Sequence, residues 1–314
     1  GRVQTQLNTT SVDGLPTSQL LIRRARIEIS VVINDRLTGE LDPDFGGGEV
    51  ELKDAFLQYE FSPALKVLAG KAYRPFGLME QTSSKRILPV ERGLRIRGVS
   101  AVDEYAALSG LDYSDRDIGL KVHGAPEAAP LGLTYAAGVF RGPLHGEAGD
   151  QDSYQFAARV TMRPIQMLRL GAGWSSRDFT DGLVGPGLRR GHAFEVDLEY
   201  GAFAPGLHVM AEASTGDLDP YADATFRGVQ AWLAYRTEAV GRHEVAFEPV
   251  FRASYADTEG EALLGTVPGG ALLTPGLNIY LTPQNRLMLN YDVWRGAGSS
   301  GDATSFKAMV QLGF

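Results

Sequence analysis

Apolar and polar side chains alternate along much of this chain, which is the pattern of β-strands with two different faces. Residues 303–314 show the pattern most clearly. There the large apolar side chains occupy even positions, as Phe306, Ala308, Val310, Leu312 and Phe314. About sixteen strands are predicted, at 1–9, 20–33, 37–43, 49–61, 65–73, 116–124, 131–141, 153–162, 167–176, 191–201, 206–214, 225–237, 243–255, 272–282, 286–294 and 303–314.

The connections between these segments alternate between short and long. Short connections such as 62–64 and 283–285 hold a few residues, whereas the intervening ones are longer and rich in Gly, Asp and Ser. An up-and-down barrel in an outer membrane has tight turns at one rim and longer loops at the other. The alternation therefore favours a transmembrane barrel.

Strand length and the character of the two faces support the same interpretation. Many segments hold nine or more residues, which matches the ~9–11 that cross a bilayer at a tilt and exceeds the ~5–6 of an average strand. Aromatic residues lie near segment ends, where an interfacial girdle would be, and the opposite face is charged, as expected of a water-filled lumen. A soluble β-sandwich, a β-propeller and a β-helix are the alternatives, although no fixed-length repeat favours the last two.

Composition narrows the class of protein further. Hydrophobic residues make up 44% of the 314 residues, yet no apolar run approaches the ~20 residues of a spanning helix. Cysteine is absent, so disulfides and thiolate metal sites are excluded. A formal charge of −8 argues against a nucleic-acid partner. No signal peptide is visible at Gly1 and the strand pattern begins at once, so a mature or trimmed chain is expected.

One connection, about residues 73–115, is far longer than the rest, and loops of this length are usually functional or disordered. Its apolar residues, such as Phe76, Ile87 and Leu88, predict an ordered loop. A loop folded into a wide bore would bring its charges to the narrowest point, where Arg and Lys favour anions. The alternative is that its arginines pair with Glu80 and Glu91 only to hold the loop against the wall.

The stretch Gly70 to Gly93 resembles the signature of the phosphate-selective porin O and P family. Its elements are Gly70–Lys71, Pro75–Phe76–Gly77–Leu78, Thr82–Ser83–Ser84 and Glu91–Arg92. The resemblance covers about residues 20–120. It implies a sixteen-stranded outer-membrane porin, usually a homotrimer, with the third loop folded inside.

We therefore predict an all-β, 16-stranded antiparallel transmembrane β-barrel formed by residues 1–314 as one domain, with 73–115 as a long third loop folded into the lumen. It would conduct small polar or anionic solutes, possibly phosphate, by passive diffusion. The expected pore and constriction residues are Arg24, Arg26, Lys71, Arg74, Lys85, Arg86, Arg92, Arg95, Arg97 and Lys121. Neutralising Arg92, Arg95 and Arg97 together should shift the reversal potential toward cations.

The lumen is expected to be mixed in charge. By strand phase Arg159, Arg169 and Arg252 join the inward basic residues, and seven acidic residues oppose them: Glu28, Glu195, Asp197, Glu212, Glu244, Glu248 and Asp292. A positive side near the loop would then face a negative side across the bore.

Other activities have weaker support. No Gly-x-Ser-x-Gly elbow occurs, and no two of the five histidines have metal-ligand spacing, so we expect no catalytic residue, metal or cofactor. The main alternative function is a plugged, structural barrel that anchors the envelope or a partner assembly. The expected location is the bacterial outer membrane with both termini periplasmic, in contact with lipid or lipopolysaccharide.

Overall fold

The computed structural model describes residues 1–12, 14–126, 129–142, 153–180, 188–219, 223–260, 268–297 and 301–314. No helix in these ranges combines the length and the apolar character needed to cross a membrane.

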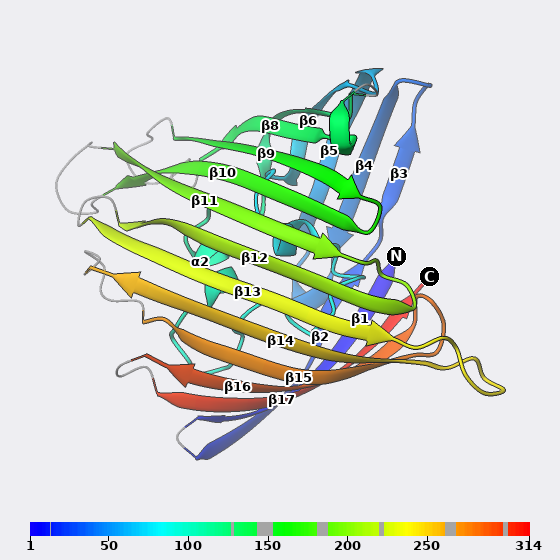
Figure 1. Cartoon of the computed structure of the whole chain (residues 1–314), viewed down its shortest axis with the longest axis vertical. Coiled ribbons are helices and arrows are strands. Elements are labelled where there is room, and N and C mark those ends of the chain that lie inside the picture. The colour runs from blue at the N-terminus through cyan, green and yellow to red at the C-terminus, as the bar shows by residue number, and fades with distance from the viewer. Residues whose placement is uncertain are drawn as a thin grey trace.

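Seventeen strands form a single sheet (Figure 1). They are β1 (Arg2–Val12), β2 (Leu15–Arg26), β3 (Ile29–Val32), β4 (Leu37–Asp44), β5 (Glu51–Ser62), β6 (Leu65–Tyr73), β7 (Arg116–Gly124), β8 (Thr134–Arg141), β9 (Tyr154–Ile165), β10 (Leu168–Thr180), β11 (Leu188–Tyr200), β12 (Gly206–Asp219), β13 (Ala224–Arg236), β14 (Ala246–Glu259), β15 (Gly270–Tyr280), β16 (Arg286–Gly296) and β17 (Asp302–Gly313). The short helices are η1 (Gly46–Gly48), α1 (Leu78–Gln81), α2 (Glu104–Gly110) and η2 (Pro130–Gly132).

The sheet closes on itself. The first strand β1 pairs antiparallel with both β2 and the last strand β17, from Arg2 opposite Gly313 to Val12 opposite Ala303. Strands β2 and β3 are separated only by residues 27–28 and together make one crossing, because β3 and the end of β2 both pair with β4. Sixteen crossings result, and the predicted 16-stranded antiparallel barrel is confirmed.

The barrel is apolar outside and polar inside. On β11, Phe194 and Val196 are 55% and 60% exposed, whereas Glu195 and Asp197, which alternate with them, are 2% and 7% exposed. Such an arrangement is the inverse of a soluble sheet protein, because hydrocarbon rather than water is the favourable surroundings for the outer face. The soluble β-sandwich alternative is thereby excluded.

Several strand ends differ from prediction, and two of the differences change where residues lie. We expected residues 10–19 to connect the first two strands, but β1 and β2 extend until only residues 13–14 separate them. Glu244, expected to face the lumen, lies instead in the connection 237–245 and is exposed. Alternation of polar and apolar residues fixes the phase of a strand but not its end.

Both chain ends lie at one rim of the barrel, where the Gly1 amino group donates a 2.7 Å hydrogen bond to the Phe314 carbonyl oxygen (Figure 1). We call it the terminal rim and the opposite one the distal rim. Connections at the terminal rim hold two to nine residues and those at the distal rim two to 42. The asymmetry is therefore present but weaker than the predicted alternation, since the distal-rim connection between β1 and β2 holds only two residues.

The outward face of β13 offers a test of membrane insertion. Val229 is 48% exposed near the middle of this strand, and Thr225 is exposed on the same face at the distal rim. A charge at the bilayer midplane costs about 2–4 kcal/mol and much less near an interface. We expect Val229→Lys to lower the free energy of unfolding from lipid vesicles by about 2–4 kcal/mol and Thr225→Lys by about 1 kcal/mol or less. Equal losses for both variants would contradict a bilayer around this strand.

Candidate functional site

The connection 74–115, which we call the internal segment, packs against the inward face of the sheet. Its side chains Leu78, Met79, Ile87 and Leu88 are buried against inward residues of β12, β13 and β14, including Trp232. A second cluster joins Phe76 and α2 to β11 and β13, and a third joins Ile96 to β15 and β16. Burial of this apolar surface holds the internal segment against the β11–β17 side of the barrel.

Wall side chains also donate hydrogen bonds to the backbone of the internal segment. Arg286 donates to the Ile87 carbonyl oxygen at 2.9 Å, and Asn278 donates to the Leu88 carbonyl oxygen at 2.9 Å. Arg252 donates to the Glu91 carbonyl oxygen at 2.8 Å. A buried irregular backbone needs such partners, because an unpaired carbonyl removed from water is costly. These wall groups therefore position residues 87–91.

The N-terminus of α2 carries a buried carboxyl group toward β12. The Glu104 carboxyl accepts a 2.7 Å hydrogen bond from Ser214, while its second oxygen has no partner among the described residues. Burial raises the pKa of Glu104 well above its ordinary value, and the nearby Glu212 carboxylate raises it further. The Glu104 carboxyl therefore takes up a proton more readily than a free carboxyl group where α2 meets the wall.

A cavity of about 1410 Å³ lies at the terminal rim, and we call it the terminal cavity. It is lined by nine Lys and Arg side chains and by one carboxylate, Glu199. The basic residues are Arg2, Lys66, Lys85, Arg86, Lys121, Arg159, Arg163, Arg169 and Arg236. In a chain whose formal charge is −8, the charges that face this cavity are strongly biased toward positive.

Six of these nine cations have a carboxylate partner, for example Lys85 with Glu28 and Arg236 with Glu248. In the part of the chain that the structure describes, Arg86, Lys121 and Arg163 have none within ion-pair distance. Lys121 donates only to the Tyr73 carbonyl oxygen at 3.1 Å, and Arg86 lies 5.9 Å from the centre of the Phe203 ring. These three charges are free to attract a solute anion.

A second cavity of about 360 Å³ lies between β1, β2 and residues 91–99 of the internal segment, and we call it the distal cavity. Arg95 and Arg97 line it, are exposed and form no ion pair among the described residues. Arg23 lines it as well, but it is bound to the Glu91 carboxylate. The two cavities are thus both lined mainly by positive charge.

Four of the predicted pore residues are engaged within the protein. Arg24 donates to Gln4 at 2.8 Å, Arg26 pairs with Asp44 at 2.7 Å, and Arg74 donates to Gln155 at 2.6 Å. Arg92 is buried and donates to the carbonyl oxygens of Met79 and Thr82. Their guanidinium groups bind groups of the wall and of the internal segment. Arg92 lines neither cavity.

The other predicted residues divide into two groups. Lys85, Arg86 and Lys121 line the terminal cavity, and Arg95 and Arg97 line the distal one. Lys71 lines neither cavity. It is paired across β6 and β7 with Ile118, which is 50% exposed on the outer face, so Lys71 lies on the outer face as well.

Some lining residues lie outside the predicted set, although the sequence contains a signal for two of them. Lys66 and Arg236 lie at strand ends on the terminal rim, where strand phase alone points them inward. Arg23 follows from a feature that alternation hides: the β1–β2 register shifts between Gln4 and Thr5, which leaves Arg23 as an extra residue in a β-bulge. The bulge brings Arg23 and its neighbour Arg24 both to the inward side.

A closed sheet that is apolar outside, polar inside and hollowed by charged cavities defines an outer-membrane diffusion channel, or porin. The chain belongs to the phosphate-selective porin O and P family, because the family model matches residues 4–203, more than half of its length. The resemblance of the sequence to this family is confirmed. The protein is accordingly a passive diffusion channel.

Solved structures support the fold. The chain is similar to an anion-selective porin from Comamonas acidovorans, with a TM-score of 0.73, 11% identity and coverage of 100% of this chain and 98% of that one. It is also similar to OprB of Pseudomonas putida, with a TM-score of 0.64, 11% identity and coverage of 99% and 94%. A third similar structure is the trimer form of OmpT of Vibrio cholerae, with a TM-score of 0.61, 14% identity and coverage of 99% of this chain and 97% of that one. No curated protein sequence matches this chain.

The raised pKa of Glu104 leads to a stability prediction. A carboxyl group whose pKa is raised in the folded state contributes most stability below its unfolded pKa, and this stability is lost as the pH rises above that value. Glu104→Gln keeps an acceptor for Ser214 without the charge. We expect it to raise the free energy of unfolding by about 1 kcal/mol at about pH 8 and by much less at about pH 4.

The measurement is the unfolding midpoint in detergent at the two pH values, read from the heat-dependent shift in gel mobility. Glu259→Gln is the matched control, because Glu259 lies at the distal end of β14, largely exposed and paired only with Arg227. Equal stabilisation at both pH values would contradict a raised pKa of Glu104.

Proposed function

We propose that this porin favours small anions and that the internal segment 74–115 forms the narrow part of its passage. The observation that carries the proposal is the lining of the terminal cavity, with nine basic side chains and one carboxylate. Rings of Arg and Lys replace part of the hydration of an anion and repel cations. The low-dielectric wall strengthens this field relative to open water.

The acidic composition of the chain does not oppose an anion preference. Most inward carboxylates are already neutralised, such as Asp292 by Arg252 and Lys307, and Glu195 by Arg159. What a solute meets is the charge left unpaired along its path, and that charge includes Arg86, Lys121 and Arg163. Anions with several oxygens, among them phosphate, match the guanidinium groups best.

The surroundings of the protein follow from its class. We place it in a bacterial outer membrane with the terminal rim toward the periplasm, because the shorter connections of such barrels lie on that side. A homotrimer is the expected assembly, and the trimer form of a structural neighbour supports it. The outer face would contact lipid and lipopolysaccharide. We propose no catalytic activity.

The second candidate function is a plugged, structural barrel. It is favoured by the number of wall groups that bind the internal segment, from Gln4 on β1 to Asn278 on β15. Steady current across a planar bilayer supports the channel, whereas silence under all voltages supports the plug.

The free cations of the terminal cavity give the selectivity test. We expect the triple variant Arg86→Gln, Lys121→Gln, Arg163→Gln to lower the anion-to-cation permeability ratio about twofold or more, because unpaired positive charge is removed from the path. The ratio is obtained from the reversal potential across a KCl gradient. Arg295→Gln is the single-charge control, since Arg295 is exposed at the distal end of β16, pairs with Asp302 and lines neither cavity. An unchanged ratio in the triple variant would remove these residues from the path.

A further inference from the structure

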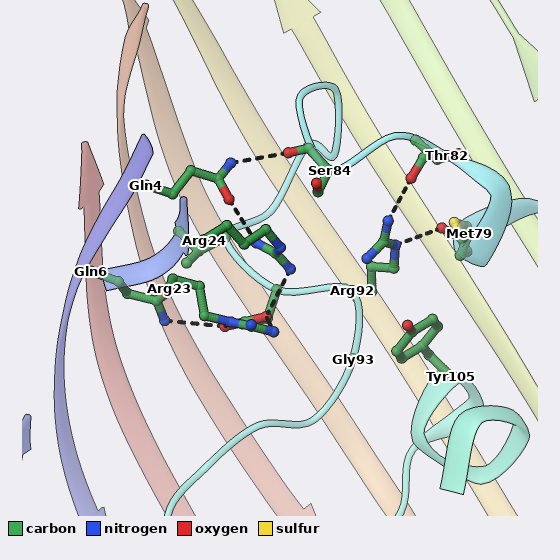
Figure 2. A network of polar contacts seen from close by, with 12 residues as sticks. Gln4, Gln6, Arg23, Arg24, Met79, Thr82, Ser84, Arg92, Gly93 and Tyr105 are labelled. Atoms are coloured by element: carbon green, nitrogen blue, oxygen red, sulfur yellow. Dashed lines mark hydrogen bonds and ion pairs between the residues drawn. The ribbon is translucent and has the colours of Figure 1, made fainter. Parts of the chain in front are cut away.

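Two adjacent arginines bind one carboxylate of the internal segment inside the barrel. Arg23 donates to the two oxygens of Glu91 at 2.8 and 3.3 Å, and Arg24 approaches one of them at 3.9 Å. Gln6 donates to the same carboxylate at 3.3 Å. Figure 2 shows this arrangement, with Gln4 and Gln6 of β1 on one side and the internal segment on the other.

The β-bulge in β2 is the reason that both arginines are available. Without the extra residue, Arg23 and Arg24 would point to opposite faces of the sheet. Leu20 and Ile22 before the bulge are 72% and 51% exposed to the outside, whereas Arg24 and Arg26 after it are buried inside. The strand thus changes phase at Arg23 and gives the lumen two consecutive guanidinium groups.

This cluster forms part of the lining of the distal cavity, where β1 and β2 face the internal segment. Arg2 of β1 lines the terminal cavity and Gln6 of the same strand lines the distal cavity. Gln4 stands between them and donates to the Ser84 carbonyl oxygen at 3.1 Å, which joins β1 to the internal segment. Glu91 is the single carboxylate that lines the distal cavity among the described residues. A solute anion that enters the distal cavity therefore meets Arg23 and Glu91 in its lining.

The donor set suits an anion with two or more oxygens. Arginine binds carboxylates and phosphates through paired N–H groups, and amide side chains add further donors. Glu91 presents the same group that a solute anion would present. Burial alone would raise the pKa of Glu91, but Arg23 and Arg24 lower it by a larger amount, so the carboxyl stays charged at any working pH.

We infer that the Glu91 carboxylate occupies, on Arg23 and Arg24, the place of a passing anion, and that Glu91 is a specificity-determining residue that limits the anion preference of the channel. This inference rests on the proposed function and adds the site and the residue. Because Glu91 is tethered, it competes at a fixed high local concentration with any mobile anion. An anion gains these two guanidinium groups only while it displaces Glu91.

The test is Glu91→Gln in the full-length protein, compared with Glu80→Gln. Glu80 is buried in the same segment and accepts from Tyr105, but it lines neither cavity. We expect Glu91→Gln to raise the anion-to-cation permeability ratio about twofold or more. Inorganic phosphate should then block the chloride current at about tenfold lower concentration, since Arg23 loses its carboxylate partner and the charge of the neighbouring Arg24 is no longer offset. Glu80→Gln should leave both values at those of the wild type.

Arg23→Gln is the second variant, because it frees the Glu91 charge rather than removing it. The permeability ratio should shift the opposite way, toward cations. If the ion pair between Arg23 and Glu91 served only to stabilise the barrel, both variants would shift the permeability ratio in the same direction. Shifts of equal sign, or no shift in Glu91→Gln, would overturn the inference.

A calorimetric titration of inorganic phosphate into the detergent-solubilised protein measures phosphate binding at the same site and does not depend on ion current. Tighter binding by Glu91→Gln than by the wild type supports the inference even if the barrel is silent, and equal binding overturns it. A wild-type channel without anion preference, by contrast, contradicts the proposed function. The two failures are therefore distinguishable.

Discussion

The constraint on which this structure depends is the absence of hydrogen-bonding partners in hydrocarbon. Each backbone N–H and C=O of a membrane-embedded strand must pair with another strand, so an open sheet edge is not tolerated. The pairing of β1 with β17 removes both edges. Closure in turn determines the character of the lumen, because it creates an interior that must be filled by polar side chains, by water or by the chain itself.

The interior uses charge mainly to hold the internal segment and the wall together. Arg252, for example, binds Asp292 and Thr274 of the wall and the carbonyl oxygens of Glu91 and Gly93. Buried ion pairs of this kind contribute little net stability compared with apolar packing, but removing one partner leaves an uncompensated charge. Many of the buried carboxylates that the structure describes are paired in this way. Among the charges that line the two cavities the unpaired ones are basic, which is how an acidic protein acquires positively lined cavities.

The architecture could be predicted because a two-residue period is a strong signal over long strands. The length of the connection 73–115 marked it as functional, and the family motif between Gly70 and Gly93 supported that prediction. Prediction from the sequence was weaker on individual side chains. Arg92 sits in the motif, yet in the structure it donates to the Met79 and Thr82 carbonyl oxygens and lines neither the terminal nor the distal cavity. An arginine inside a folded loop can bind solute or backbone, and spacing does not distinguish these, because the backbone path that decides it is set by long-range packing.

Arg23 also shows that the role of a single arginine cannot be predicted from sequence spacing alone, here because a lumen-facing residue was missed. Alternation carried back from the inward Arg24 and Arg26 assigns Arg23 to the lipid face, and only the register of β1 against β2 reveals the bulge that lets both Arg23 and Arg24 reach the lumen. A one-residue insertion thus alters which charges a solute meets without altering composition, net charge or strand number. In a barrel, selectivity depends on phase as much as on residue type, since each inward position has lipid-facing neighbours on both sides. A bulge is the local change by which two consecutive residues of one strand can both reach the lumen, and here those two residues are arginines opposite a glutamate of the internal segment.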